Sequence, residues 1–94
     1  MSETRPPTLE TELLEAVGHA LAGDWERAHE IAQEHEDDAR ANWIHAICHR
    51  MEGDLANARY WYNRVGRPFR ESVSTEGELI EIRDVLSASR TPRG

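Results

Sequence analysis

Apolar residues recur along this chain at the three- and four-residue spacing of helices that are buried on one side. Before Gly23 the apolar positions are Leu9, Leu13, Ala16, Val17, Ala20 and Leu21. Such a stripe predicts an amphipathic helix. Thr8 precedes it as an N-cap candidate, and Glu10 and Glu12 follow in the first turn, where carboxylates stabilise a helix. We therefore expect a first helix between Thr8 and Gly23.

Three further helices are predicted before residue 68, each with an aspartate ahead of its first turn. Asp24, Asp38 and Asp54 are N-cap candidates, because an Asp side chain accepts hydrogen bonds from free backbone N–H groups. Gly53 and Gly66 are the expected ends of the third and fourth helices. The three buried stripes consist of Trp25, Ala28, Ile31, Ala32 and His35, then Trp43, Ile44, Ile47, Cys48 and Met51, then Leu55, Ala58, Trp61, Tyr62 and Val65.

A loop over residues 67–74 and a fifth helix over 75–88 complete the prediction. Thr75 with Glu78 matches the capping-box pattern. The apolar residues after it keep helical spacing at Leu79, Ile82, Val85 and Leu86. Alternation with a period of two never persists, so no strand is expected. The fold class is therefore all-α, with about five helices.

An internal repeat relates the first helix pair to the second. GDWERA at residues 23–28 returns as GDLANA at 53–58, and the same offset of thirty residues pairs Leu13 with Trp43, Val17 with Ile47, His19 with His49 and Ala28 with Ala58. One such unit cannot bury its apolar face alone, so copies are expected to stack. We therefore expect two antiparallel α-hairpins, with the fifth helix capping the stack.

The second unit, AICHRMEGDLANARYWYNRVGRP, resembles tetratricopeptide-type repeats. The matching positions are Gly53, Leu55, Ala58, Tyr62 and Val65. The period is 30 residues here, against 34 in that family. The segment also resembles that of small bacterial proteins of this kind. Over residues 9–68 the resemblance implies a TPR-like α-hairpin repeat fold and a surface that holds a peptide or a partner protein.

The length of 94 residues suits a single domain with a modest core. No stretch approaches the roughly 20 apolar residues of a membrane span, and the start MSETRPPT lacks the apolar core of a signal peptide. The lone Cys48 forms no internal disulfide, so we expect a cytoplasmic protein. The expected division of 1–94 is 1–7 as a flexible N-terminus, 8–37 and 38–68 as repeats, 75–88 as the capping helix and 89–94 as a flexible tail.

Charge is unevenly distributed along a chain whose formal net charge is −7. Residues 1–38 hold eleven acids and two arginines, whereas 39–73 hold three acids and six arginines. Two interpretations follow. The oppositely charged halves attract each other or a neighbouring copy of the chain, or the charge forms the electrostatic field of a ligand site. The net acidity opposes nucleic-acid binding, since such proteins usually carry a basic excess.

Polar residues on the first helix of each repeat form the first candidate surface: Glu15, His19, Asn42, His45 and His49. His45 and His49 are four apart and share one side of a helix. With His19 and Glu15 they make an imidazole and carboxylate set that suits a metal ion. Packed helices lie about 8–10 Å apart, however, and no HExxH or CxxC motif is present. We therefore expect these residues to line an open face, and we predict no cofactor.

Arginines and aromatics alternate in the segment ARYWYNRVGRPFR, residues 58–70. Trp61 and Tyr62 fall on the buried stripe of the fourth helix, so core packing is expected for both. The second candidate surface consists of Tyr60, Arg64, Arg67 and Arg70. Guanidinium groups bind the carboxylates of a protein or the phosphates of nucleic acid.

No catalytic motif accompanies these residues. Cys48 lies on a buried stripe, which disfavours a nucleophile, and neither a nucleophile motif nor a glycine-rich phosphate loop is present. Arg50 is expected to pair with Asp54 one turn later. The prediction is a non-catalytic interaction module that binds a protein, a peptide or itself. The alternatives are a metal or small-ligand site at the histidines and nucleic-acid binding at the arginines.

Overall fold

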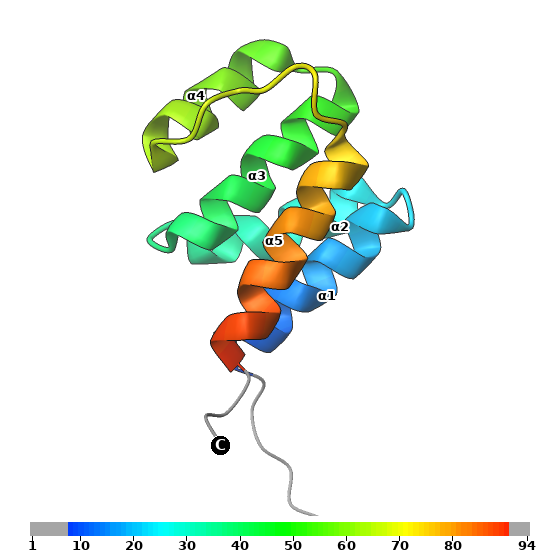
Figure 1. Ribbon diagram of the computed structural model, residues 1–94, viewed down its shortest axis with the longest axis vertical. Helices are drawn as coiled ribbons and strands as arrows, with labels where there is room; N and C mark the ends of the chain where they lie inside the picture. The colour runs from blue at the N-terminus through cyan, green and yellow to red at the C-terminus, as the bar shows by residue number, and fades with distance from the viewer. Residues whose placement is uncertain (1–7, 91–94) are drawn as a thin grey trace, which may run out of the picture.

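The computed structural model describes residues 8–90, which form five α-helices and no strand (Figure 1). The elements are α1 (Leu9–Leu21), α2 (Trp25–Ala32), a 3-10 turn (Gln33–His35), α3 (Ala39–Glu52), α4 (Leu55–Val65) and α5 (Thr75–Arg90). The all-α prediction is confirmed. The sequence predicts flexible ends at 1–7 and 89–94. Residues 89–90 instead belong to α5, which corrects the predicted tail, and residues 1–7 and 91–94 lie outside the described residues. No helix in the described range is long and apolar enough to cross a membrane.

The first four α-helices begin at the predicted caps. A backbone N–H of the first turn donates to the side chain of Thr8, Asp24, Asp38 and Asp54 in α1, α2, α3 and α4 respectively. The start of α5 differs from the prediction. Its cap is Ser74 rather than Thr75, because the N–H of Gly77 donates to the Ser74 hydroxyl over 2.9 Å.

The turns after α1 and after α3 have the same hydrogen bonds, thirty residues apart. The N–H of Asp24 donates to the carbonyl oxygen of His19 over 2.8 Å, and that of Asp54 donates to His49 over 2.9 Å. The glycine before each aspartate has a φ of 93° or 90°, a conformation that glycine adopts without a steric penalty. The recurrence in sequence therefore corresponds to a recurrence of local structure.

Helix α3 occupies the centre of the molecule, and every residue from 41 to 49 is buried. It packs against α1, α2, α4 and α5. A helix enclosed on all sides has no solvent face on which to place polar residues. Among its buried positions are the large side chains Trp43, Ile44 and Ile47 together with Asn42 and His45.

Helix α5 covers the side of the helix pair α1 and α3 and does not cap α4. Its buried residues Leu79, Ile82 and Leu86 belong to the common core, and the helix packs against α1 and α3. Figure 1 shows α5 running alongside α3, and the loop that follows α4 leads back across the molecule to the start of α5. The predicted fifth helix is therefore present, but its expected position at the end of the stack is wrong.

A buried carboxylate connects α5 to α3 and α4. Glu78 is 1% exposed, and it accepts hydrogen bonds of 2.7 Å from the side chains of Trp43, Arg50 and Tyr62. A charged partner and two further donors compensate for its loss of hydration. Arg50 therefore pairs with Glu78 and not, as the sequence predicted, with Asp54. Glu78 also does not act as the capping-box carboxylate, because its side chain is directed into the core.

Candidate functional site

Three histidines from two helices meet in the region between α2, α3 and α4. His45 and His49 stand one turn apart on α3, and His29 comes from α2. Their ring centroids are 4.4 Å apart for His29 and His45, 5.2 Å for His29 and His49, and 4.9 Å for His45 and His49. One ring nitrogen from each residue lies within 4.8 Å of the others. We refer to these three residues as the histidine cluster.

The histidine cluster is largely enclosed. The Trp61 ring of α4 stacks on the His45 ring, with centroids 4.0 Å apart and an angle of 17° between the planes. His45 is 5% exposed and His49 is 9% exposed, whereas His29 is only partly buried. Solvent therefore reaches the cluster most easily at His29.

Two ring nitrogens of the cluster have distinct environments. His49 Nδ1 lies 2.7 Å from a carboxylate oxygen of Glu52, a partner that fixes the orientation of the ring and places the proton on Nδ1. The neutral ring then has its lone pair on Nε2. His45 Nδ1 is buried, and no group in the described part of the chain forms a hydrogen bond with it.

Burial and neighbouring charges lower the basicity of the cluster. Burial lowers the pKa of His45 to about 3, and the neighbouring His29 and His49 act in the same direction. The pKa of His29 is also lowered, first by burial and then by His49. His45 is therefore a neutral ring at physiological pH, with a nitrogen lone pair not used for a proton.

The polar stripe expected on an open face is not continuous. Asn42, His45 and His49 are buried because α3 is enclosed, which corrects the expectation that they line an exposed surface. Asn42 donates to the carbonyl oxygen of Glu36 over 2.8 Å. The two remaining positions are on α1, where Glu15 is exposed and His19 is partly buried, and neither belongs to the histidine cluster.

His29 is the member of the cluster that the sequence patterns did not single out. The offset of thirty residues pairs it with Arg59, so the repeat offers no matching histidine. The available signal was its position beside Ala28, which is fully buried in the core. His29 also lies four residues after Trp25 and three before Ala32, both on the predicted buried stripe, and residues at these spacings share one side of a helix.

The second predicted surface is divided between two regions. Tyr60 and Arg64 lie among the exposed residues of α4 that we call the α4 outer face, namely Leu55, Arg59, Tyr60, Asn63 and Arg64. A guanidinium nitrogen of Arg64 lies 3.4 Å from the Tyr60 hydroxyl, and its carbon lies 5.1 Å from the centre of the Trp61 ring. As expected, Tyr62 is in the core, whereas Trp61 is only half-buried.

Arg67 and Arg70 are directed away from that face. The Arg67 guanidinium stacks 3.6 Å from the centre of the Trp43 ring, and Arg70 forms an ion pair of 2.6 Å with Glu81 of α5. The four residues Tyr60, Arg64, Arg67 and Arg70 therefore do not form one patch. This separation removes the continuous basic surface on which the nucleic-acid interpretation depended.

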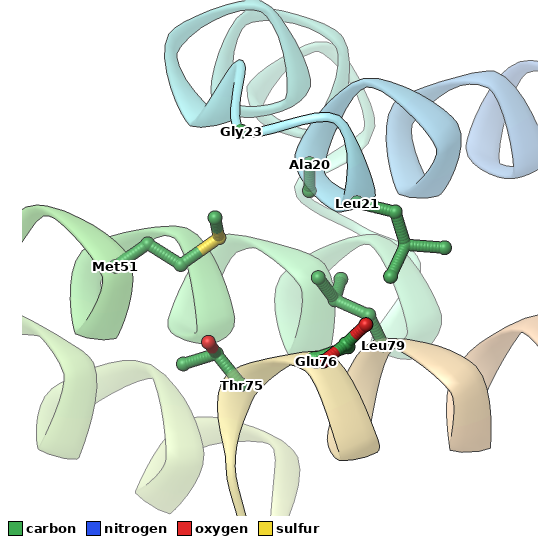
Figure 2. A pocket seen from close by; sticks show the side chains of 7 residues that line it. All are labelled: Ala20, Leu21, Gly23, Met51, Thr75, Glu76 and Leu79. Atoms are coloured by element: carbon green, nitrogen blue, oxygen red, sulfur yellow. The ribbon is translucent and has the colours of Figure 1, made fainter.

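Two surface hollows lie outside these regions. One, of about 270 Å³, is lined by Ala20, Leu21, Gly23, Met51, Thr75, Glu76 and Leu79 (Figure 2). Glu76 is its only ionisable lining residue, so it lacks the convergent polar groups of a specific ligand site. The other, of about 220 Å³, is lined by Glu12, Glu15, Arg27, Glu30, Ile31 and Glu34. Four carboxylates make this surface between α1 and α2 acidic.

Comparison of the chain with known protein families, with curated proteins and with solved structures found no match. The functional candidates are therefore the two regions with the most distinctive side-chain chemistry. They are the histidine cluster in the interior of the fold and the α4 outer face on its surface.

Proposed function

We propose that this chain is a non-catalytic helical module that binds a protein partner through the α4 outer face. The observation that carries the proposal is the position of α4, whose backbone approaches only α3 among the described helices and whose side-chain hydrogen bond to α5 runs from Tyr62 to Glu78. Its opposite side is uncovered, and the large residues Leu55 and Tyr60 are 47% and 54% exposed there. Tyrosine and arginine are enriched among the residues that anchor protein interfaces, and both are exposed on α4.

The charge of this face indicates the chemistry of the partner. The sequence of α4, LANARYWYNRV, contains two arginines and no acid, although the whole chain is acidic. Arg64 donates a hydrogen bond to Tyr60 but has no carboxylate partner among the described residues, so its guanidinium can donate to a carboxylate of another molecule. The expected partner surface therefore carries carboxylates, and the acidic hollow between α1 and α2 makes a second copy of this chain one such partner.

A TPR-like architecture is part of this proposal. The glycine and aspartate turn that recurs after thirty residues supports it, as does the packing of α1 on α2 and of α3 on α4. In such stacks the terminal helix has an open side where a further helix can dock. The α4 outer face occupies that position in the proposed arrangement.

A photocrosslinking experiment tests the proposal. A benzoyl-phenylalanine introduced at Tyr60 is compared with the same group at Asp84, an exposed residue of α5 that lies outside both the α4 outer face and the acidic hollow. We expect a protein adduct in cells from position 60 only, and loss of this adduct after Arg64→Glu. The matched change Arg83→Glu, at an exposed position of α5, leaves it unaffected. Equal adducts at both positions, or none, contradict the proposal.

A further inference from the structure

The geometry points to a binding site for a divalent transition-metal ion of the zinc class, formed by His29, His45 and His49. This site is independent of the proposed interaction face. Imidazole nitrogen is a preferred ligand of Zn²⁺, Cu²⁺ and Ni²⁺. Three protein ligands with one position left for water are a common arrangement for zinc sites that remain accessible. The partial exposure of His29 provides the access.

The spacing of the three nitrogens is close to that of a metal site. A zinc–nitrogen bond of about 2.0–2.1 Å in tetrahedral geometry places ligand nitrogens about 3.3 Å apart. One nitrogen from each residue of the cluster already lies within 4.8 Å of the others. Metal binding therefore requires the three nitrogens to approach one another by at most about 1.5 Å.

A buried nitrogen without a partner is the second observation. His45 is 95% buried, since only 5% of it is exposed, and its Nδ1 has no hydrogen bond within residues 8–90. Buried polar atoms almost always have a partner in folded proteins. The neighbouring groups are also imidazoles, with one nitrogen of each ring within 4.8 Å of the others, so a shared metal ion is the partner that this environment suits.

The carboxylate on His49 is the third observation. Glu52 lies 2.7 Å from His49 Nδ1, the contact that metal-bound histidines typically make through the ring nitrogen that does not bind the ion. Glu52 and Asp54 also lie within 4.8 Å of His49 by their ligand atoms. Their negative charge compensates for the charge of a cation held by neutral rings.

The structure also changes the residues assigned to the site. The sequence favoured His19 and Glu15 as companions of His45 and His49, whereas the folded chain brings His29 to them. A second acidic group, of Glu12, Glu34 and His35, has no comparable support because His35 and Glu12 already form a pair of 2.9 Å. The exchange of His19 for His29 gives the experiment a matched control.

Metal titration of the full chain, purified without a histidine tag and stripped with a chelator, tests this inference. Zn²⁺ is titrated against a chromophoric chelator, and Co²⁺ binding is followed by its visible absorption. We expect one equivalent per chain. The substitution His29→Gln lowers the affinity by more than about tenfold, and Glu52→Gln lowers it by about 10- to 100-fold. His19→Gln leaves it unchanged.

Several results would overturn the site. These are no binding of Zn²⁺ or Co²⁺ by the folded wild type, equal affinity in the His29→Gln variant, or loss of affinity in the His19→Gln variant. His29 is the informative position because it is only partly buried, so its substitution leaves the core intact. Circular dichroism verifies that each variant is folded. Bound Cu²⁺ should also quench the fluorescence of Trp61, which stacks on His45, and Trp61→Phe removes that part of the quenching.

Discussion

The indole nitrogen of Trp43 donates a 2.7 Å hydrogen bond to the carboxylate of Glu78, although the two residues are 35 positions apart in sequence. The same carboxylate forms an ion pair of 2.7 Å with Arg50, and both side chains are almost completely buried. Removal of one partner from a buried pair leaves an uncompensated charge. The contact between Trp43 and Glu78 therefore marks the position where the attachment of α5 is most sensitive to substitution.

The substitution Glu78→Ala is expected to lower the free energy of unfolding by about 3–5 kcal/mol, because Arg50 then remains buried without its partner. The control is Glu81→Ala, which removes the exposed ion pair with Arg70 and is expected to cost less than about 1 kcal/mol. Urea denaturation followed by circular dichroism measures both. A loss for Glu78→Ala as small as the loss for Glu81→Ala would show that the buried carboxylate of Glu78 contributes little to stability.

The two tyrosines of the chain offer a matched pair of substitutions. Tyr62 is 1% exposed and its hydroxyl donates to Glu78 over 2.7 Å, whereas Tyr60 is 54% exposed. Tyr62→Phe is expected to destabilise the fold by about 1.5–3 kcal/mol, the range for a hydrogen bond to a charged acceptor. Tyr60→Phe is expected to change stability by less than about 0.5 kcal/mol. Thermal denaturation of the two variants should therefore separate them clearly.

Stability is expected to fall as the pH is lowered through the histidine range. Burial lowers the pKa of His45 from 6.5 to about 3, so between these values the unfolded chain binds a proton that the folded chain does not. The loss between pH 7.5 and pH 5.0 is about 2 kcal/mol for this one residue. Urea denaturation at the two pH values measures it. His45→Gln should reduce this difference in stability between the two pH values. An unchanged difference in that variant would show that His45 does not cause it.

Cys48 is expected to be unreactive in the folded protein. It is fully buried, and burial raises the pKa of its thiol to about 12, so almost no thiolate is present at neutral pH. A thiol reagent such as Ellman's should label the folded chain slowly and the urea-unfolded chain at once. Fast labelling without denaturant would mean that α3 opens readily.

Local signals in the sequence were sufficient for the helices. The caps at Thr8, Asp24, Asp38 and Asp54 and the end of α4 at Gly66 follow from side-chain and backbone chemistry within a few residues. These capping interactions involve only residues close together in sequence, so local patterns identify them. For this reason the starts of the first four helices were predicted correctly, whereas α2 ends at Ala32, before His35 of its predicted stripe, and α5 continues to Arg90, past the predicted end at 88.

The position of α5 and the membership of the histidine cluster depend on distant residues instead. Glu78 shares a helix face with Ile82 and Leu86, but an acid three residues after a threonine also matches a capping box. Only the fold shows that Arg50 and Tyr62 meet it. His29 was missed for a similar reason, since its partners belong to the next helix and not to its own.

The complete burial of residues 41–49 has a consequence for redesign of the chain. Every substitution in this segment alters a packed contact, so a library randomised there should contain few folded members. The α4 outer face touches no other described helix and should tolerate extensive variation. New binding specificities can therefore be selected on α4 without changing the segment that holds the helices together.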